Sequence, residues 1–282
     1  FVETGKVDLL HAFAYMIPST VICDMMGVPR NMVKPVQVWV EDVAEYIASS
    51  TDPSRYDRAR AALFALYGYF ARLTVERQQK PGDDLVSLLI AARQAGKLSD
   101  EELIICCILF IVGGHDTTAN LIGNGFYWLL STPEQLERLR SNPELSRSAV
   151  EEILRYTGTA ITIVRKVTRD LDFKGSAFKK GDIVFLFVAA ANRDPQVFDD
   201  AQGFDVGRKA NGHLAFGFGN HVCLGGSLAR LETRIAIDTA LARLPGLHRP
   251  HRIFEMQEPA AQRLKPGAGL FGQFQPLGGA AE

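Results

Sequence analysis

The sequence of 282 residues has little cysteine, little tryptophan and no excess of charge of either sign. Its four cysteines are too few and too irregularly spaced for a disulfide framework, which indicates a reducing compartment. Neither CxxC nor HxxxH occurs, so a zinc site of the usual spacing is not expected. The cysteines are Cys23, Cys106, Cys107 and Cys223.

The charges nearly cancel, with 31 Lys and Arg against 32 Asp and Glu. A net charge of −1 gives no reason to expect a nucleic acid or a membrane surface as partner. The longest apolar run, Leu103 to Val112, is too short to span a bilayer, and the N-terminus lacks a signal-peptide profile. We therefore expect a cytoplasmic protein.

Apolar periodicity predicts helices over 6–26, 29–50 and 56–79, with breaks near 27–29, 51–53 and 81–82. Ser99 with Glu102 forms a capping box before an apolar run, and the helix that starts there is expected to reach about Leu130. Roughly 30 residues at 1.5 Å each give about 45 Å. Two shorter helices are expected over 133–140 and 143–156.

The composition changes after these helices. Residues 161–191 are rich in β-branched and aromatic residues, with turn signals at Lys174-Gly175 and at 180–182, which predicts short strands and hairpins. Residues 191–211 read as irregular, and 224–244 as a final helix. No linker or repeat divides the chain. The expected fold is mainly α with small β-sheets, an α+β domain over residues 1–282.

One cysteine has unusual neighbours, in the stretch FGFGNHVCLGGSLAR at 216–230. Glycines surround Cys223, and the positive end of the following helix would point toward its sulfur. Both features favour a thiolate that could bind a metal. A buried structural cysteine is the other interpretation, and taken alone it is the more common one.

This stretch resembles the haem-binding loop of the cytochromes P-450, and no fixed position of that pattern fails. The resemblance implies haem b, iron protoporphyrin IX, with the Cys223 thiolate as iron ligand. It also implies that Arg165 and His221 bind the propionates, and more weakly His213, which also reads as a surface histidine. The matching positions are Phe216, Gly217, Gly219, His221, Cys223, Gly225, Leu228, Ala229 and Arg230.

A second motif, GGHDTT at 113–118, lies inside the expected long helix. Two glycines in a helix interior cost about 1 kcal/mol each, which a helix crossing or a ligand could offset. Asp116 and Thr117 offer an acid and a hydroxyl that can relay protons. The motif resembles the family's oxygen-activation motif, which implies that Thr117 stabilises dioxygen and its protons while Asp116 links to solvent.

A third pair, Glu152 and Arg155, has the spacing of the family's ExxR motif. The same spacing occurs at Glu144 and Arg147, so the pattern alone says little. The strand residue Arg165 that follows favours the first pair. The resemblance implies that Glu152 and Arg155 clamp the haem loop, with Arg208 as a third basic residue.

The resemblance covers essentially the whole chain, which is expected to have the cytochrome P-450 fold without its N-terminal portion. Residues ahead of the motifs are apolar and are expected to face a substrate pocket, although core packing explains them equally well. They are Leu109, Val112, Gly113, Ile161 and Ile163.

The resemblance implies a monooxygenase, an iron-dependent oxidoreductase that inserts one oxygen atom from O2 into a small, apolar organic substrate. Because the chain has no flavin or iron–sulfur motif, electrons would come from NAD(P)H through a reductase and a ferredoxin- or flavodoxin-type partner. A non-catalytic scaffold that stabilises a partner enzyme is the alternative. Oxygenation driven by peroxide is a third reading.

Overall fold

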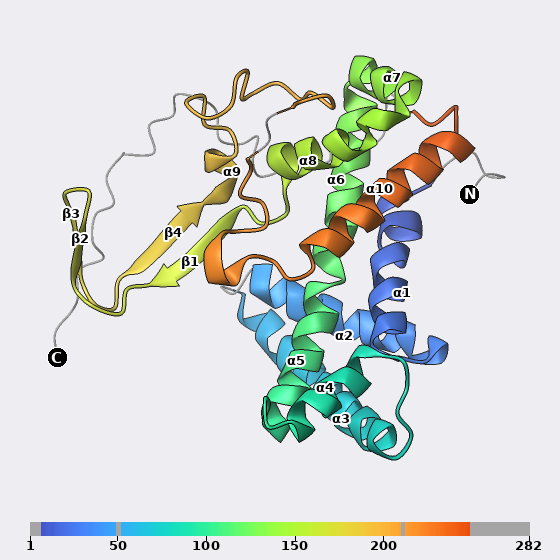
Figure 1. The fold of residues 1–282 in the computed structure, drawn as a ribbon, viewed down its shortest axis with the longest axis vertical. Coiled ribbons are helices and arrows are strands. Elements are labelled where there is room, and N and C mark those ends of the chain that lie inside the picture. The colour runs from blue at the N-terminus through green and yellow to red at the C-terminus, as the bar shows by residue number, and fades with distance from the viewer. Residues whose placement is uncertain (1–6, 49–51, 210–211, 249–282) are drawn as a thin grey trace. The chain divides into compact units, whose positions relative to one another are not determined.

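The computed structural model describes residues 7–48, 52–209 and 212–248, and all of them fall in one unit formed by residues 1–249. The prediction of a single domain over 1–282 extends beyond these residues and stays a prediction. The described part is mainly helical with two small sheets, as the sequence predicts (Figure 1).

Five helical elements come first. Their bounds match the periodic segments, except that α3 begins before Tyr56, because Asp52 accepts a hydrogen bond from the Ser54 amide and Pro53 occupies the first turn. Helix α4, begun by Asp84, was not expected from the sequence. The elements are the π-helical turn η1 (Leu10–Ala14), α1 (Met16–Met25), α2 (Arg30–Ala48), α3 (Pro53–Gln79) and α4 (Leu85–Gln94).

The expected single long helix is instead two helices, α5 (Asp100–Gly113) and α6 (Asp116–Ser131). The capping box is confirmed, since the Ser99 side chain accepts from the Glu102 amide and the Glu102 side chain from the Ser99 amide. The helix breaks at Gly114 and His115, which end α5 and precede α6. The break thus falls within the GGHDTT stretch at 113–118.

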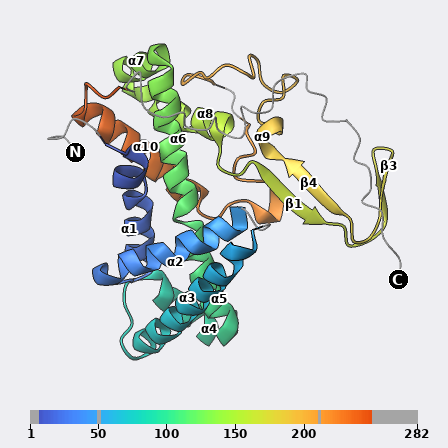
Figure 2. The ribbon, with the colours of Figure 1, turned by 180° about the vertical axis from the view of Figure 1, so that it is seen from behind.

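The remaining helices are α7 (Pro133–Ser141), the 3₁₀ turn η2 (Pro143–Leu145), α8 (Ser146–Thr157), the short α9 (Val188–Ala191), the 3₁₀ turn η3 (Gly219–His221) and α10 (Gly226–Arg243). Helix α6 packs between α10 and α8, and its buried side chains join theirs in one apolar core. A second apolar core is formed by buried residues of the helices from α1 through α5. Figure 2 shows the same elements from behind.

Both sheets are two-stranded and antiparallel. Strand β1 (Thr162–Lys166) pairs with β4 (Ile183–Phe187), and β2 (Leu171–Phe173) pairs with β3 (Ser176–Phe178). The expected turn at Lys174-Gly175 is confirmed, and both residues adopt positive φ, 54° and 81°. That backbone suits the tight hairpin between β2 and β3.

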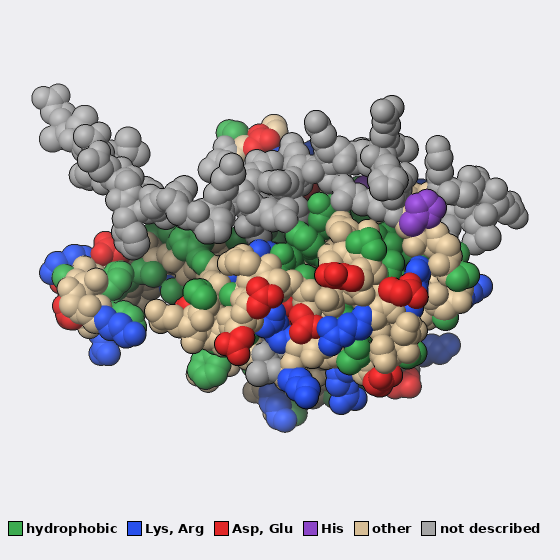
Figure 3. Space-filling model, turned by 90° about the horizontal axis from the view of Figure 1, so that it is seen from above, with side chains coloured by type: hydrophobic (Ala, Val, Ile, Leu, Met, Phe, Trp, Pro, Cys, Tyr) green, Lys and Arg blue, Asp and Glu red, His purple; other side chains and the backbone are tan. Residues whose placement is uncertain are grey.

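By length and composition one continuous stretch, Asp100–Ser131, is apolar enough to cross a membrane, and 44% of its most apolar window is buried inside the protein. The core helix of a water-soluble protein has the same properties, so this stretch is weak evidence of a membrane span. On the face shown in Figure 3, acidic and basic side chains are interspersed. This mixture accords with the near-zero net charge.

Candidate functional site

The ion pair expected between Glu152 and Arg155 is present at the centre of the fold. Both side chains are 0% exposed. Arg155 donates from Nε to Oε2 and from Nη2 to Oε1 of Glu152, both at 2.8 Å. Its guanidinium also donates to the carbonyl oxygens of Asn192, Ala201 and Gly203 at 2.8–2.9 Å. One buried arginine thus holds the irregular segment that precedes the cysteine loop.

Arg208 completes this cluster. It donates from Nε to Glu152 Oε2 at 3.0 Å and binds the carbonyl oxygens of Asp199, Asp200 and Gly203. The Asp205 amide donates to Glu152 Oε1 at 3.0 Å. A buried charge is tolerated when it is paired and hydrogen-bonded, and here both conditions hold. By contrast, Glu144 and Arg147 are both exposed.

The structure corrects the expectation for His213. Its side chain is only 3% exposed, Nε2 lies 3.0 Å from Glu151 Oε2, and Nδ1 accepts from the Ala215 amide at 3.2 Å. Both ring nitrogens are therefore engaged by protein groups, and the side chain is not that of a surface histidine. The local sequence does not reveal this burial, because the partner Glu151 is 62 residues away.

Glu151 contacts both His213 and Arg230, and thereby links the segment before the cysteine loop to α10. Arg230 donates to Oε1 at 2.6 Å and to Oε2 at 3.1 Å. Burial alone would raise the pKa of Glu151, but the hydrogen bonds from His213 and Arg230 outweigh it and lower that pKa to about 2. The Arg230 guanidinium also lies 4.5 Å from the centre of the Phe216 ring. The two ends of the cysteine loop are held by this cluster.

The cysteine loop itself is shaped by backbone contacts. The Cys223 amide donates to the Phe216 carbonyl at 2.9 Å, and Gly217 and Gly219 adopt φ of 73° and 72°, a region that favours glycine. The Cys223 side chain is exposed, and α10 begins three residues later at Gly226. Figure 1 shows this loop beside β1. The reading of Cys223 as a buried structural thiol is therefore wrong.

The residues of this loop fit a flat, apolar ligand that bears anionic groups. Phe218, Val222 and Leu224 are 87%, 57% and 83% exposed, unusually high for large apolar side chains. An added Cβ at Gly225 would meet nothing within 4 Å. Two cationic or ionisable side chains, Arg165 on β1 and His221 on the loop, are exposed. Haem, with an apolar ring and two carboxylates, suits this set of groups.

The break between α5 and α6 arranges the second motif. The Thr117 hydroxyl donates to the Gly113 carbonyl at 2.9 Å, which satisfies an acceptor that the break would leave free. Asp116 is the first residue of α6, and one of its oxygens accepts from the Tyr15 hydroxyl at 2.8 Å. His115 is buried, and burial lowers its pKa to about 4, so it stays neutral at pH 7.

The residues expected to face a pocket lie in two settings. Leu109 is 63% exposed on α5, and Gly113 has open space where a Cβ would stand. Val112 packs partly against the apolar core, and Ile161 and Ile163 are half-buried. Leu109 and Gly113 thus lie outside the apolar core, whereas Val112 packs against it.

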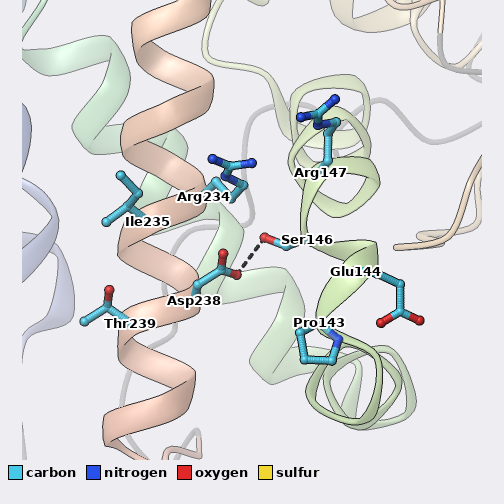
Figure 4. Close-up of a pocket in the computed structure, with 8 residues that line it drawn as sticks. All are labelled: Pro143, Glu144, Ser146, Arg147, Arg234, Ile235, Asp238 and Thr239. Atoms are coloured by element: carbon cyan, nitrogen blue, oxygen red, sulfur yellow. Dashed lines mark hydrogen bonds between the residues drawn. The ribbon is translucent and has the colours of Figure 1, made fainter.

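A separate depression lies between η2, α8 and α10 (Figure 4). Ser146 donates to Asp238 across it at 2.6 Å. Arg234, which lines the depression, lies eight residues after Gly226, the first residue of α10. At 1.5 Å per residue it is about 12 Å along the helix from the end next to the cysteine loop. The depression is open and lined by both polar and apolar groups, and it contains none of the motif residues. Its lining residues are Pro143, Glu144, Ser146, Arg147, Arg234, Ile235, Asp238 and Thr239.

Two residues at the site, Tyr15 and Glu151, could not be identified from local sequence patterns. Tyr15 and Glu151 contact Asp116 and His213, from which they are separated by 101 and 62 residues. A tyrosine inside a predicted helix and a glutamate beside ExxR carry no local signal of these contacts. Only the fold brings them to the site.

Comparison with known proteins gives a consistent result. A family model described as "Cytochrome P450" matches residues 67–144 and 140–245. The curated "Biotin biosynthesis cytochrome P450" of Bacillus subtilis is 39% identical over 243 residues, 86% of this chain and 62% of that protein. "Cytochrome P450 monooxygenase PikC" of Streptomyces venezuelae is 39% identical over 246 residues, 86% of this chain and 58% of its own.

A solved structure agrees in fold. The crystal structure of P450BioI in complex with hexadec-9Z-enoic acid ligated acyl carrier protein superposes with a TM-score of 0.83 and 38% identity. The match covers 88% of this chain and 65% of that one. The chain thus spans about three fifths of the length of the curated relatives it matches. With the exposed cysteine loop, the buried ExxR cluster and the broken helix in place, these matches show that the chain belongs to the cytochrome P450 family.

Proposed function

We propose that this protein is a haem-thiolate monooxygenase that inserts one oxygen atom from O2 into a small, apolar organic substrate. The observation that carries the proposal is the exposed thiol of Cys223, held by a loop whose apolar side chains also point outward. Ordinary folding leaves such groups inside. A ligand that covers them explains why the loop is built this way.

In this proposal Cys223 holds the iron of haem b, and Arg165 and His221 pair with the propionates. Arginine and protonated histidine form strong, charge-assisted hydrogen bonds with carboxylates. Phe216, Gly217 and Gly225 would lie against the ring. When bound, the haem supplies the iron at which dioxygen is activated, and thiolate ligation favours cleavage of the O–O bond.

Asp116 and Thr117 would supply and hold protons during the reaction. The Thr117 hydroxyl is already oriented by the Gly113 carbonyl, so its oxygen remains free to accept a further hydrogen bond. Asp116 is half-buried and therefore within reach of solvent. An acid and a hydroxyl on consecutive residues can pass a proton from water to the reacting group.

The Glu152, Arg155 and Arg208 cluster serves as a structural clamp in this proposal. It binds carbonyl oxygens of the segment before the loop and touches no reacting atom. A rigid support of this kind holds a metal ligand in position.

The partners follow from the chemistry. Two electrons are needed for each oxygen atom inserted, and we infer that NAD(P)H supplies them through a reductase and a ferredoxin- or flavodoxin-type protein. Such partners and a bacterial origin of the relatives fit a cytoplasmic location. An apolar substrate is inferred from the exposed Leu109 and the half-buried Ile161 and Ile163.

The test is the absorption spectrum of the reduced, carbon monoxide-treated protein after haem is supplied. We expect a thiolate-type Soret band in the wild type and its loss in Cys223→Ser, because a serine hydroxyl does not replace a thiolate ligand. Cys106→Ser is the matched control, since Cys106 lies on α5 and should not affect the band.

Absence of the band from the wild type would contradict the proposal and favour the scaffold alternative. Turnover with hydrogen peroxide alone, equal to that with NAD(P)H and redox partners, would point instead to the peroxide-driven reaction.

A further inference from the structure

Tyr15 makes a contact that neither motif explains. Its hydroxyl donates to Asp116 Oδ1 at 2.8 Å, across a separation of 101 residues in sequence. Tyr15 is half-buried, and Asp116 is also half-buried at the first position of α6. A residue from the N-terminal helices thus holds the acid of the proposed proton path.

The backbone is shaped to bring Tyr15 there. The Tyr15 amide donates to the Leu10 carbonyl at 2.9 Å, five residues back, which is the hydrogen bond of a π-helical turn. Such turns are rare and occur often at functional sites, because the extra residue rotates the side chains that follow. Figures 1 and 2 both show α1 beside α6.

The facing side of α6 permits a close approach. Asp116, Asn120 and Gly123 share one face by their spacing of four and three residues. A Cβ at Gly123 would stand 2.7 Å from Leu10 Cδ1, so the lack of a side chain there lets η1 lie close to the helix. The Asn120 side chain donates to the Asp116 backbone carbonyl at 2.9 Å and thereby supports the same end of α6.

The tyrosine ring is held from two sides. It stacks on the ring of His11 with 5.6 Å between centres and lies 5.8 Å from the ring of His115. Burial and the neighbouring Asp116 raise the pKa of Tyr15; a hydrogen bond with the Asn120 side chain opposes this rise, and Glu41 on α2 adds slightly to it. The hydroxyl therefore keeps its proton at neutral pH and remains a hydrogen-bond donor.

Not every tyrosine hydroxyl in the described part of the chain has a hydrogen-bond partner. The Tyr69 hydroxyl is buried and has no hydrogen-bond partner among the described residues. The Tyr15 contact is thus a specific arrangement of two groups, one of which belongs to the proposed reaction.

We propose that Tyr15 is a positioning residue for oxygen activation: its hydroxyl holds the Asp116 carboxylate in one orientation at the break between α5 and α6. The Thr117 hydroxyl is held by the Gly113 carbonyl, four residues earlier in the chain, whereas the Asp116 carboxylate is held by the distant Tyr15. Tyr15 donates a hydrogen bond and transfers no proton. This inference rests on the proposed function for the role of Asp116, whereas the contact itself can be tested without it.

The experiment uses the haem-loaded full chain and compares Tyr15→Phe with the wild type. Phenylalanine keeps the ring contacts with His11 and His115 and removes only the hydroxyl. We expect kcat to fall about tenfold with KM within about twofold, because the acid is misplaced while the pocket is unchanged. A larger solvent deuterium isotope effect on kcat is also expected. Tyr69→Phe is the matched control and should keep wild-type values.

A second measurement does not depend on activity. Urea unfolding of Tyr15→Phe, Asp116→Ala and the double variant forms a double-mutant cycle. We expect Tyr15→Phe to lower the urea midpoint of unfolding when Asp116 is present. Once Asp116 is replaced by Ala, the same change should have little effect on the midpoint.

The inference is overturned if Tyr15→Phe retains wild-type kcat and isotope effect, if it changes KM alone, or if its effect on unfolding is the same with and without Asp116. If the thiolate-type Soret band is missing from every variant, the proposed function fails on its own. The unfolding cycle then decides alone whether Tyr15 holds Asp116. Additive effects of the two substitutions on unfolding would contradict the contact, and non-additive effects would support it.

Discussion

The Glu152 cluster and the cysteine loop are opposites in how they use their side chains. Glu152 and Arg155 are fully buried and bind groups from several distant segments. Phe218 and Leu224 of the loop are 87% and 83% exposed, and the loop keeps its shape through backbone hydrogen bonds and two glycines. The chain completes the first region by itself, whereas the second leaves its side chains free for a ligand.

The largest effect is expected from breaking the first region. Replacing Glu152 with Ala would leave the buried Arg155 guanidinium without its carboxylate and remove the acceptor for Arg208. Removing one partner of a buried ion pair costs about 3–5 kcal/mol, so we expect a loss of that size in the free energy of unfolding. Urea titration monitored by circular dichroism measures it.

The matched control is Glu144→Ala, which removes an exposed glutamate of the same i, i+3 spacing. It should change the free energy of unfolding by less than about 0.5 kcal/mol. Equal losses for the two variants would mean that the buried cluster is not a clamp.

Glu232 can be compared directly with Glu152, because it is a second buried glutamate but lacks the hydrogen-bond donors that surround Glu152. It is 6% exposed on α10, and its Oε2 has no hydrogen-bond partner among the described residues. Burial raises the pKa of Glu232 to about 7. The folded state therefore favours the neutral acid, and its contribution to stability is present below the ordinary pKa of 4.5 and is lost as pH rises through 7.

We expect the wild type to lose up to about 3 kcal/mol of unfolding free energy between pH 4.5 and 8 through this group. Glu232→Gln, which stays neutral, should be the more stable protein at pH 8 and nearly equal to the wild type at pH 4.5. Urea titrations at both pH values measure the difference. A variant that is less stable than the wild type at pH 8 would show that the carboxylate is paired and charged.

The sequence predicted the elements that depend on local signals. Ser99 with Glu102 located the start of α5, and Lys174-Gly175 located a hairpin, because caps and tight turns involve residues a few positions apart. Helix α4 was missed although Asp84 caps it. The family pattern singled out Cys223 and the Glu152 pair; in the structure Cys223 is exposed and Arg155 donates to Glu152, while their roles toward haem stay predictions.

Contacts between distant residues could not be predicted in this way. The partner of His213, Glu151, lies on another element, and the contact of Tyr15 with Asp116 joins residues 101 apart. In each case the decisive group comes from a segment that only packing brings near.

The smallest effect is expected in the cysteine loop, from Leu224→Asp. Because Leu224 is 83% exposed, replacing it should change the unfolding free energy of the haem-free protein by less than about 0.5 kcal/mol. The same change should weaken haem binding, since a carboxylate would then face an apolar ring and two propionates. Haem titration followed by the Soret band measures that second effect. A loop used only for folding would give the reverse result, with a large loss of stability and no change in haem affinity, and the contrast with the Glu152 cluster would disappear.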